Sequence, residues 1–168
     1  MQRRFAWFLI GSLVLICGRS HAADYQLPGR VLRIIDGDSL VLDVQGSQYR
    51  LDLWGIDAPE RNQPWGEAAA DRLNRTLTGS FVNVRIDGGG SDGRFAGRVM
   101  LRARDVALDL LYDGLAWSAI PGDGTHQQAE HPYDLAQRQA SAARRGLWSD
   151  GHPVPPWEWR NRRPEPSP

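Results

Sequence analysis

The acidic residues of two short segments are the groups in this chain best suited to do chemistry. Asp36 and Asp38 flank a glycine directly after a run of β-branched residues, and Asp57 and Glu60 follow a second apolar run. Carboxylates gathered at the ends of adjacent strands repel one another unless a cation or a proton neutralises them. Since oxygen ligands suit hard cations, the pattern predicts a shared Ca²⁺ or Mg²⁺ ion. Asp-Gly is also a common turn pair, so ordinary polar turns are the alternative for either motif alone.

The segments that must position these carboxylates have the patterns of short strands and helices. Hydrophobic periodicity predicts strands over 30–35, 39–44, 48–54, 81–86 and 94–101, and helices over 66–77, 106–112 and 133–145. Asp105 should cap the second helix at its start and Gly114 should end it. Five short strands with helices inserted and appended fit a small, partly open barrel better than a parallel sheet. The sequence therefore predicts an α+β, mainly β fold: a five-stranded barrel with three helices.

The two ends of the chain differ from this domain, which we place at 28–150. Residues 1–22 combine a basic start, an apolar stretch and a small-x-small pattern ending at Ala22. That arrangement predicts a cleaved signal peptide, and hence a secreted or periplasmic protein with no integral membrane segment after cleavage. Residues 151–168 are rich in proline, which predicts an extended, weakly ordered extension. Docking of Trp157 and Trp159 on the barrel would order its first half.

Charge and cysteine content narrow the classes of function. The whole chain has 20 basic and 20 acidic residues, and every cation is arginine. Without the predicted signal peptide, 17 arginines face 20 acids, which argues against strong non-specific binding to a polyanion. Cys17 is the only cysteine and lies inside the predicted signal, so the mature chain has neither disulfides nor thiolate metal sites. We expect a monomer.

Five motifs, in this order, resemble the staphylococcal nuclease (thermonuclease) family, from about residue 30 to residue 148. They are D-G-D-S at 36–39, G-I-D-A-P-E at 55–60, G-R-x-x-G-R-V at 93–99, V-x-x-x-L-L-x-x-G-L-A at 106–116 and A-R-R-G-L-W at 143–148. The resemblance implies an OB-fold barrel and a Ca²⁺-dependent phosphodiesterase that acts on DNA and RNA.

The resemblance also implies roles for individual residues. Asp38, Asp57 and the backbone carbonyl of Ala58 are at the positions of metal ligands, and Asp36 would support them without touching the ion. The remaining positions carry the reaction and the substrate contacts: Glu60 as general base, Arg94 as the second catalytic arginine, and Arg98 as a further candidate for substrate binding.

One position departs from the family pattern. The family's first catalytic arginine lies five residues before the second metal aspartate, where this chain has Asp52; the nearest arginine is Arg50. Residues two apart in a strand share a face and are roughly 7 Å apart, so Arg50 lies on the correct side.

Three interpretations of this departure remain open. Arg50 reaches the phosphate, directly or through a β-bulge. Asp52 instead pairs with Arg50 or adds a ligand to the metal, which would give a slow or altered enzyme. Otherwise the site binds metal or a partner without cutting nucleic acid. A nuclease is the first hypothesis, and a weakened OB module that binds a partner or an anionic ligand in the cell envelope is the second.

Overall fold

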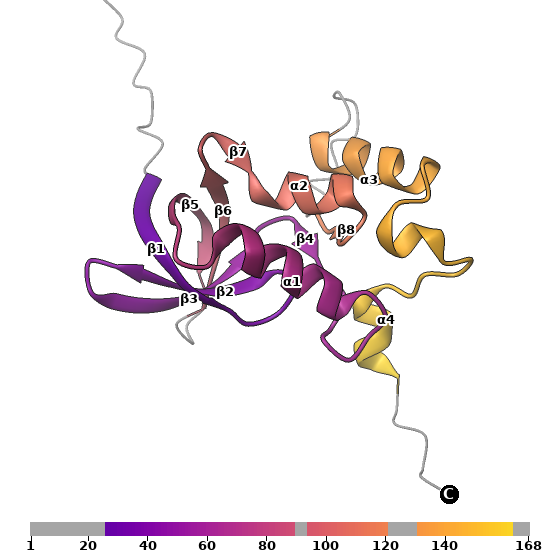
Figure 1. The fold of residues 1–168 in the computed structure, drawn as a ribbon, viewed down its shortest axis with the longest axis horizontal. Helices are drawn as coiled ribbons and strands as arrows, with labels where there is room; N and C mark the ends of the chain where they lie inside the picture. Colours follow the sequence, from indigo (N-terminus) through magenta and orange to yellow (C-terminus); the bar gives the residue numbers. More distant parts are fainter. Residues whose placement is uncertain (1–25, 90–93, 121–130, 163–168) are drawn as a thin grey trace, which may run out of the picture.

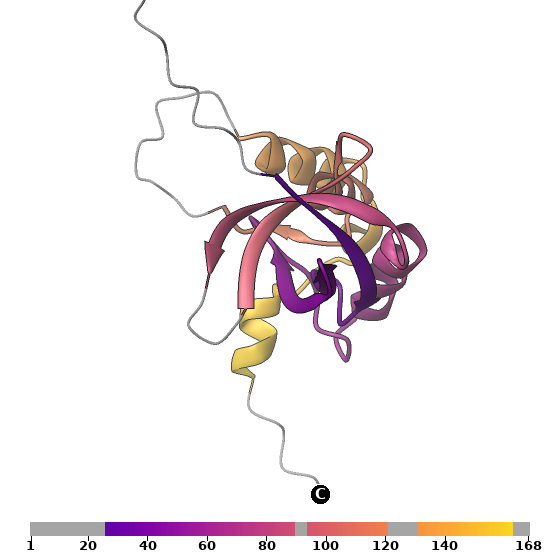
Figure 2. The same cartoon turned by 90° about the vertical axis from the view of Figure 1, so that its left-hand side faces the viewer.

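A curved sheet closes on itself to form the body of the molecule (Figures 1 and 2). The computed structural model describes residues 26–89, 94–120 and 131–162, so the predicted signal peptide lies outside the described residues. The long strands are β1 (Gln26–Ile34), β2 (Ser39–Val44), β3 (Ser47–Leu53), β5 (Phe81–Gly89) and β6 (Arg94–Leu101). All five predicted strands are therefore present.

The order of the strands shows how the barrel closes. Neighbours run antiparallel in the order β3-β2-β1-β5-β6, and β3 then pairs in parallel with β6. β2 and β3 are joined by Gln45 and Gly46, both with positive φ, as a two-residue hairpin turn that follows strand twist requires. The closed five-stranded barrel, with helices added to it, confirms the predicted α+β, mainly β fold class.

The core is apolar and comes from both the strands and the helices. In β3, Leu51 and Leu53 are buried while Tyr49 is exposed near the start of the strand, so the inner part of the strand contributes to the core. The largest fully buried side chains include Leu40, Leu51, Leu73, Leu77, Leu110 and Leu111. These leucines come from β2, β3 and the first two helices, which explains why the helices are fixed against the barrel.

The part of the chain that the structure describes contains four α-helices. They are α1 (Gly66–Leu77), α2 (Val106–Asp113), α3 (Pro132–Ala142) and α4 (Pro156–Asn161), and a 3₁₀ turn spans Gly146–Ser149. The remaining strands are two residues long: β4 (Ile56–Asp57) pairs with β8 (Trp117–Ser118), and β7 (Arg104–Asp105) extends β6. In both views α4 lies away from α2 and α3. No helix in these described ranges is long and apolar enough to cross a membrane.

The caps of α2 agree with the sequence, while the end of α3 does not. Asp105 accepts from the N–H groups of Ala107 and Leu108, and Gly114 ends α2 with a φ of 70°. The third helix is shorter than the predicted range 133–145. It ends at Ala142, and Arg144 just beyond it has a φ of 49°, which is incompatible with a continued α-helix.

The C-terminal extension corrects the prediction of an extended tail. Residues 156–161 form α4, because Pro156 occupies the first helical position, where its missing N–H costs nothing. Pro156 is buried. The ring of Trp157 packs edge-on against that of Trp117, with 5.7 Å between the ring centroids. The expectation that a docked tryptophan orders the first half of the extension therefore holds, and the prediction of three helices was one too few.

Candidate active site

The turn between β1 and β2 is braced by Asp36. Its Oδ1 accepts from the backbone N–H of Asp38 at 3.2 Å and from that of Ser39 at 2.8 Å. The N–H of Ile35 donates to the Ser39 carbonyl at 2.9 Å and closes the turn. A carboxylate that binds the backbone two and three residues ahead is a strong local turn former. Asp36 thus sets the position of Asp38, which follows it.

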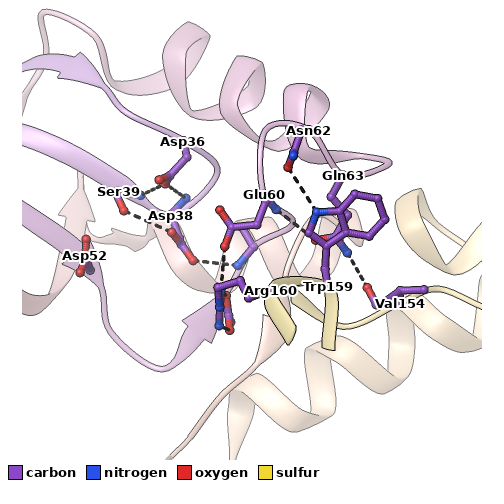
Figure 3. A network of polar contacts seen from close by, with 12 residues as sticks. Asp36, Asp38, Ser39, Asp52, Glu60, Asn62, Gln63, Val154, Trp159 and Arg160 are labelled. Carbon is purple, nitrogen blue, oxygen red and sulfur yellow. Dashed lines mark hydrogen bonds and ion pairs between the residues drawn. The ribbon is translucent and has the colours of Figure 1, made fainter. Parts of the chain in front are cut away.

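The turn that carries Asp36 and Asp38 lies against the segment that carries Asp57, and this close approach is possible because Gly37 has no side chain. A Cβ at Gly37 would lie 2.7 Å from the Cβ of Ala58 and 2.8 Å from that of Ala69. Across this close approach, Asp38 Oδ2 accepts from the N–H of Ala58 at 2.7 Å (Figure 3). The Asp38 carbonyl also accepts from the N–H of Leu53 at 2.8 Å. Residues 20 positions apart in sequence are thereby joined through a single carboxylate.

Burial and charge make Asp38 the most perturbed carboxylate of the group. Burial raises the pKa of Asp38 well above its usual range, and the negative charges of Asp36 and Asp57 add to the rise; the bond from Ala58 only partly opposes it. Burial also acts to raise the pKa of Asp36, but hydrogen bonds from Asp38 and Ser39 outweigh it and the pKa falls. The charged form of Asp38 therefore needs a nearby cation more than its neighbours do.

Glu60 is held by its own loop through Gln63. The N–H of Glu60 donates to Gln63 Oε1 at 3.2 Å, and the N–H of Gln63 donates back to the Glu60 carbonyl at 2.8 Å. A Cβ at Gly66, where α1 begins, would lie 1.8 Å from the Glu60 carbonyl oxygen, so only glycine fits there. The buried Gln63 also donates through Nε2 to the carbonyl of Val154 at 2.6 Å. One amide thus joins the loop of Glu60 to the C-terminal extension.

Arg160 of α4 reaches across to two of the predicted site residues (Figure 3). Its Nη1 donates to Asp57 Oδ1 at 3.1 Å and to Glu60 Oε1 at 2.8 Å, and its Nη2 donates to Asp57 Oδ2 at 2.7 Å. These bonds raise the pKa of Arg160, so the guanidinium stays charged. Arg160 was not predicted from the sequence as a site residue. The neighbouring Trp157 and Trp159 indicated that this segment docks, but they gave no information on which charged side chain it would bring to the site.

Asp52 pairs with both nearby arginines. Arg94 Nη2 donates to Asp52 Oδ2 at 2.8 Å, while Arg50 Nε lies 3.7 Å from Asp52 Oδ1, close enough for an ion pair but too far for a hydrogen bond. The parallel register of β3 and β6 sets Arg50 opposite Arg94, which explains the arrangement. The structure therefore has the Arg50–Asp52 pairing of the second interpretation and extends it to Arg94. In Figure 3 Asp52 stands apart from Glu60 and Arg160.

Arg98 contacts a different set of groups. Its guanidinium carbon lies 4.1 Å from the centre of the Trp54 ring, a cation–π distance, and its Nε lies 3.7 Å from Asp87 Oδ2. These contacts direct Arg98 toward Trp54 and Asp87, so its predicted contact with substrate would need the side chain to move.

The acidic group fits a hard divalent cation in chemistry, though its side chains are not gathered around one. Among residues 26–89, 94–120 and 131–162, no three His, Cys, Asp or Glu side chains are placed to hold a metal. Arg160 engages both carboxylate oxygens of Asp57 and so stands where a cation would stand. Oxygen donors with several negative charges are what Ca²⁺ takes. The roles of Asp38, Asp57 and the Ala58 carbonyl as ligands stay predictions.

A closed five-stranded barrel with helices on its surface and carboxylates where two of its turns meet defines an OB-fold protein of the nuclease-like class. Residues 50–150 match the family model described as "Staphylococcal nuclease homologue". An "Uncharacterized endonuclease" of Escherichia coli O157:H7 is 33% identical over 138 residues, covering 80% of this chain and 86% of the relative. The chain therefore belongs to the staphylococcal nuclease family, which implies a nucleic acid substrate.

Two further relatives show how widely the similarity extends. "Protein ParB" of Escherichia coli is 32% identical over 178 residues, covering 98% of both chains. "Staphylococcal-like nuclease CAN1" of Arabidopsis thaliana is 31% identical over 121 residues, which is 72% of this chain but 36% of the plant protein. The alignment with "Protein ParB" therefore covers the C-terminal extension as well as the barrel.

Proposed function

We propose that the protein is a Ca²⁺-dependent nuclease that hydrolyses phosphodiester bonds of DNA or RNA. The observation that carries the proposal is the meeting of the two acidic turns, where Asp38 accepts from the N–H of Ala58 beside Asp57 and Glu60. Membership of the nuclease family supports it. The acidic turns are held in place by hydrogen bonds and by the close approach at Gly37, as a catalytic site requires.

The site residues would divide the work as follows. Asp38, Asp57 and the Ala58 carbonyl would hold the cation, while Asp36 keeps the turn in place. When bound there, Ca²⁺ would supply positive charge that offsets the charge of the phosphate. Glu60, whose side chain is 36% exposed, can be reached by water and would take the proton of the attacking water as the new P–O bond forms. The P–O bond to the leaving nucleoside oxygen would break in the same displacement, and that oxygen would take a proton from solvent.

The arginines would bind the phosphate. Arg94 is the predicted donor to the phosphate oxygens, where charge-assisted hydrogen bonds strengthen as negative charge grows in the transition state. In the structure Arg94 donates to Asp52, and Arg50 lies beside the same carboxylate. Arg50, Asp52 and Arg94 together carry a net charge of +1. This side of the site therefore attracts a phosphate less than two unpaired arginines would.

A cleavage assay tests the proposal. Purified protein is incubated with single-stranded DNA, duplex DNA and RNA, with Ca²⁺ and with a chelator in excess. Glu60→Gln should lower the cleavage rate about 10²- to 10⁴-fold because the general base is lost. Asp109→Asn, a carboxylate on α2 that pairs with Arg104, should leave the rate unchanged. No cleavage by the folded wild-type protein at saturating Ca²⁺ would refute the proposal.

We also propose that the protein acts outside the cytoplasm as a monomer. The basis is the signal pattern of residues 1–22. Intact-mass measurement of protein recovered from the periplasm and the medium should give a chain that starts at Ala23, and sedimentation should give one copy. A full-length chain retained in the cytoplasm would contradict the first statement.

A non-catalytic binding module is the second candidate, and Asp52 is the observation that favours it. Because Asp52 neutralises arginine at the position where the family has another arginine, the site has lost cationic character. The substitution Asp52→Arg separates the two candidates. Strong cleavage by this variant, with none by the wild type, would identify the natural chain as a degenerate nuclease that binds an anionic ligand without cutting it.

A further inference from the structure

Arg160 occupies the place in the site where a phosphate-binding cation is needed. We propose that Arg160, carried by the C-terminal extension, is a second arginine that binds the substrate phosphate in this protein, beside the predicted Arg94. It thereby supplies a function for which Asp52 is unsuited. This inference rests on the proposed nuclease function and deepens it by adding a catalytic residue from outside the matched residues 50–150.

The extension holds Arg160 in a defined position. Trp159 Nε1 donates to Asn62 Oδ1 at 3.2 Å, which fixes α4 to the loop that follows Glu60. Gln63 ties the same loop to Val154, just before the helix. Pro156 is buried. These anchors all lie just before Arg160 in the chain and fix the helix that carries it, which reduces the freedom lost when the side chain binds an anion.

The geometry of the guanidinium suits an exchange of partners. Three hydrogen bonds to Asp57 and Glu60 use three of the five N–H donors of an arginine. The side chain is 48% exposed, so an anion from solvent can reach it. A cation that binds Asp57 would compete with Arg160 for the lone pairs of its oxygens, which weakens the bonds between Arg160 and Asp57. The donors released in this way would stay next to Glu60, where the phosphate of a substrate has to lie.

The charge of the site requires such a group. Asp36, Asp38, Asp57 and Glu60 carry four negative charges when ionised, and a divalent cation removes only half of that. A phosphodiester is itself an anion, so it would be repelled by what remains. Arg160 lowers this excess from within hydrogen-bonding distance of two of the four carboxylates.

The same contacts are compatible with a different role, a plug that keeps a cation off Asp57. The two roles predict opposite effects of removing the guanidinium. A plug would weaken Ca²⁺ binding, so its removal would raise both Ca²⁺ affinity and cleavage. If Arg160 binds the phosphate, its removal would take away a contact to the anion and would weaken phosphate binding even when Ca²⁺ saturates the site.

Calorimetric titration separates them. The probe is a nucleoside 3′,5′-bisphosphate at saturating Ca²⁺, and the variants are Arg160→Gln, Arg160→Lys and the matched control Arg162→Gln. Arg162 lies two residues further along and approaches the Trp159 ring at 5.4 Å. Arg160→Gln should weaken bisphosphate binding about 10- to 100-fold, since a charge-assisted bond is lost. Arg160→Lys should fall between it and the wild type, and Arg162→Gln should stay within about twofold.

The outcomes also distinguish this inference from the proposed function. Thermal unfolding of each variant first checks that the barrel is intact. Unchanged bisphosphate affinity in a folded Arg160→Gln variant, or faster cleavage by it, would overturn the role of Arg160 while leaving the nuclease proposal in place. A wild type that binds bisphosphate through Arg160 but cuts nothing would overturn the nuclease proposal alone. A wild type that does neither would overturn both.

Discussion

Substitution of Gly37 by alanine tests whether the two acidic turns meet as described. The new methyl group would lie 2.7 Å from the Cβ of Ala58 and 2.8 Å from the Cβ of Ala69, about 1 Å inside ordinary carbon contact. Both neighbours are Cβ atoms that move only with their backbone, so the turns must separate. The bond from Ala58 N–H to Asp38, now 2.7 Å long, would then be stretched or lost.

The expected cost follows from these two effects. Overpacking a tight contact costs about 1–3 kcal/mol, and the loss of a hydrogen bond to a carboxylate about 1.5–3 kcal/mol. Because relief of the first effect causes the second, the two are not fully additive, and Gly37→Ala should lower the free energy of unfolding by about 2–4 kcal/mol. Urea denaturation with a chelator present measures this without any contribution from metal.

A control and a rescue sharpen the test. Gly151→Ala adds a methyl group with no heavy atom within 4 Å and should change stability little. In the double variant Gly37→Ala with Ala58→Gly, one of the two opposing methyl groups is gone, so the combined loss should be smaller than the sum of the single losses by about 1 kcal/mol. If Gly37→Ala is no more destabilising than Gly151→Ala, the turns do not touch and the shared site is wrong.

Two other substitutions test the electrostatics. Tyr133 is buried and donates from its hydroxyl to Asp105 Oδ2 at 2.6 Å, so Tyr133→Phe should destabilise the fold by about 1–2 kcal/mol in urea, and no loss would mean that this bond contributes nothing. The raised pKa of Asp38 means that its ionisation opposes folding. Asp38→Asn should therefore stabilise the metal-free protein by an amount that is absent in acid, grows as pH rises from the ordinary aspartate pKa to the raised one, and is constant above it, while Ca²⁺ binding is lost. Thermal unfolding across pH with chelator checks the sign, and a variant less stable than wild type at neutral pH would contradict it.

The barrel could be predicted because its signals are local. The strands, the cap at Asp105 and the end of α2 at Gly114 each follow from a few neighbouring residues. The two acidic motifs could likewise be placed at strand ends from the apolar runs before them. Short-range patterns of this kind survive in the fold because tertiary contacts reinforce them.

The features that escaped prediction depend on residues distant in sequence. Arg160 and Glu60 are 100 positions apart, and the prolines around α4 predicted an open chain where the buried surface favours a helix. The pairing of Arg94 with Asp52 requires β3 and β6 to be neighbours, which becomes true only when the sheet closes. Neither spacing nor periodicity predicts these two contacts, because each forms only when the barrel has closed.

The bridge made by Gln63 has a practical consequence. Because one amide joins the Glu60 loop to Val154, a fragment trimmed at residue 150 would lose the anchor of that loop along with the guanidinium of Arg160. The same site would be changed by a bulky C-terminal fusion or by a protease that cuts the exposed chain end. In each case the chemistry of the acidic residues would change although none of them had been replaced.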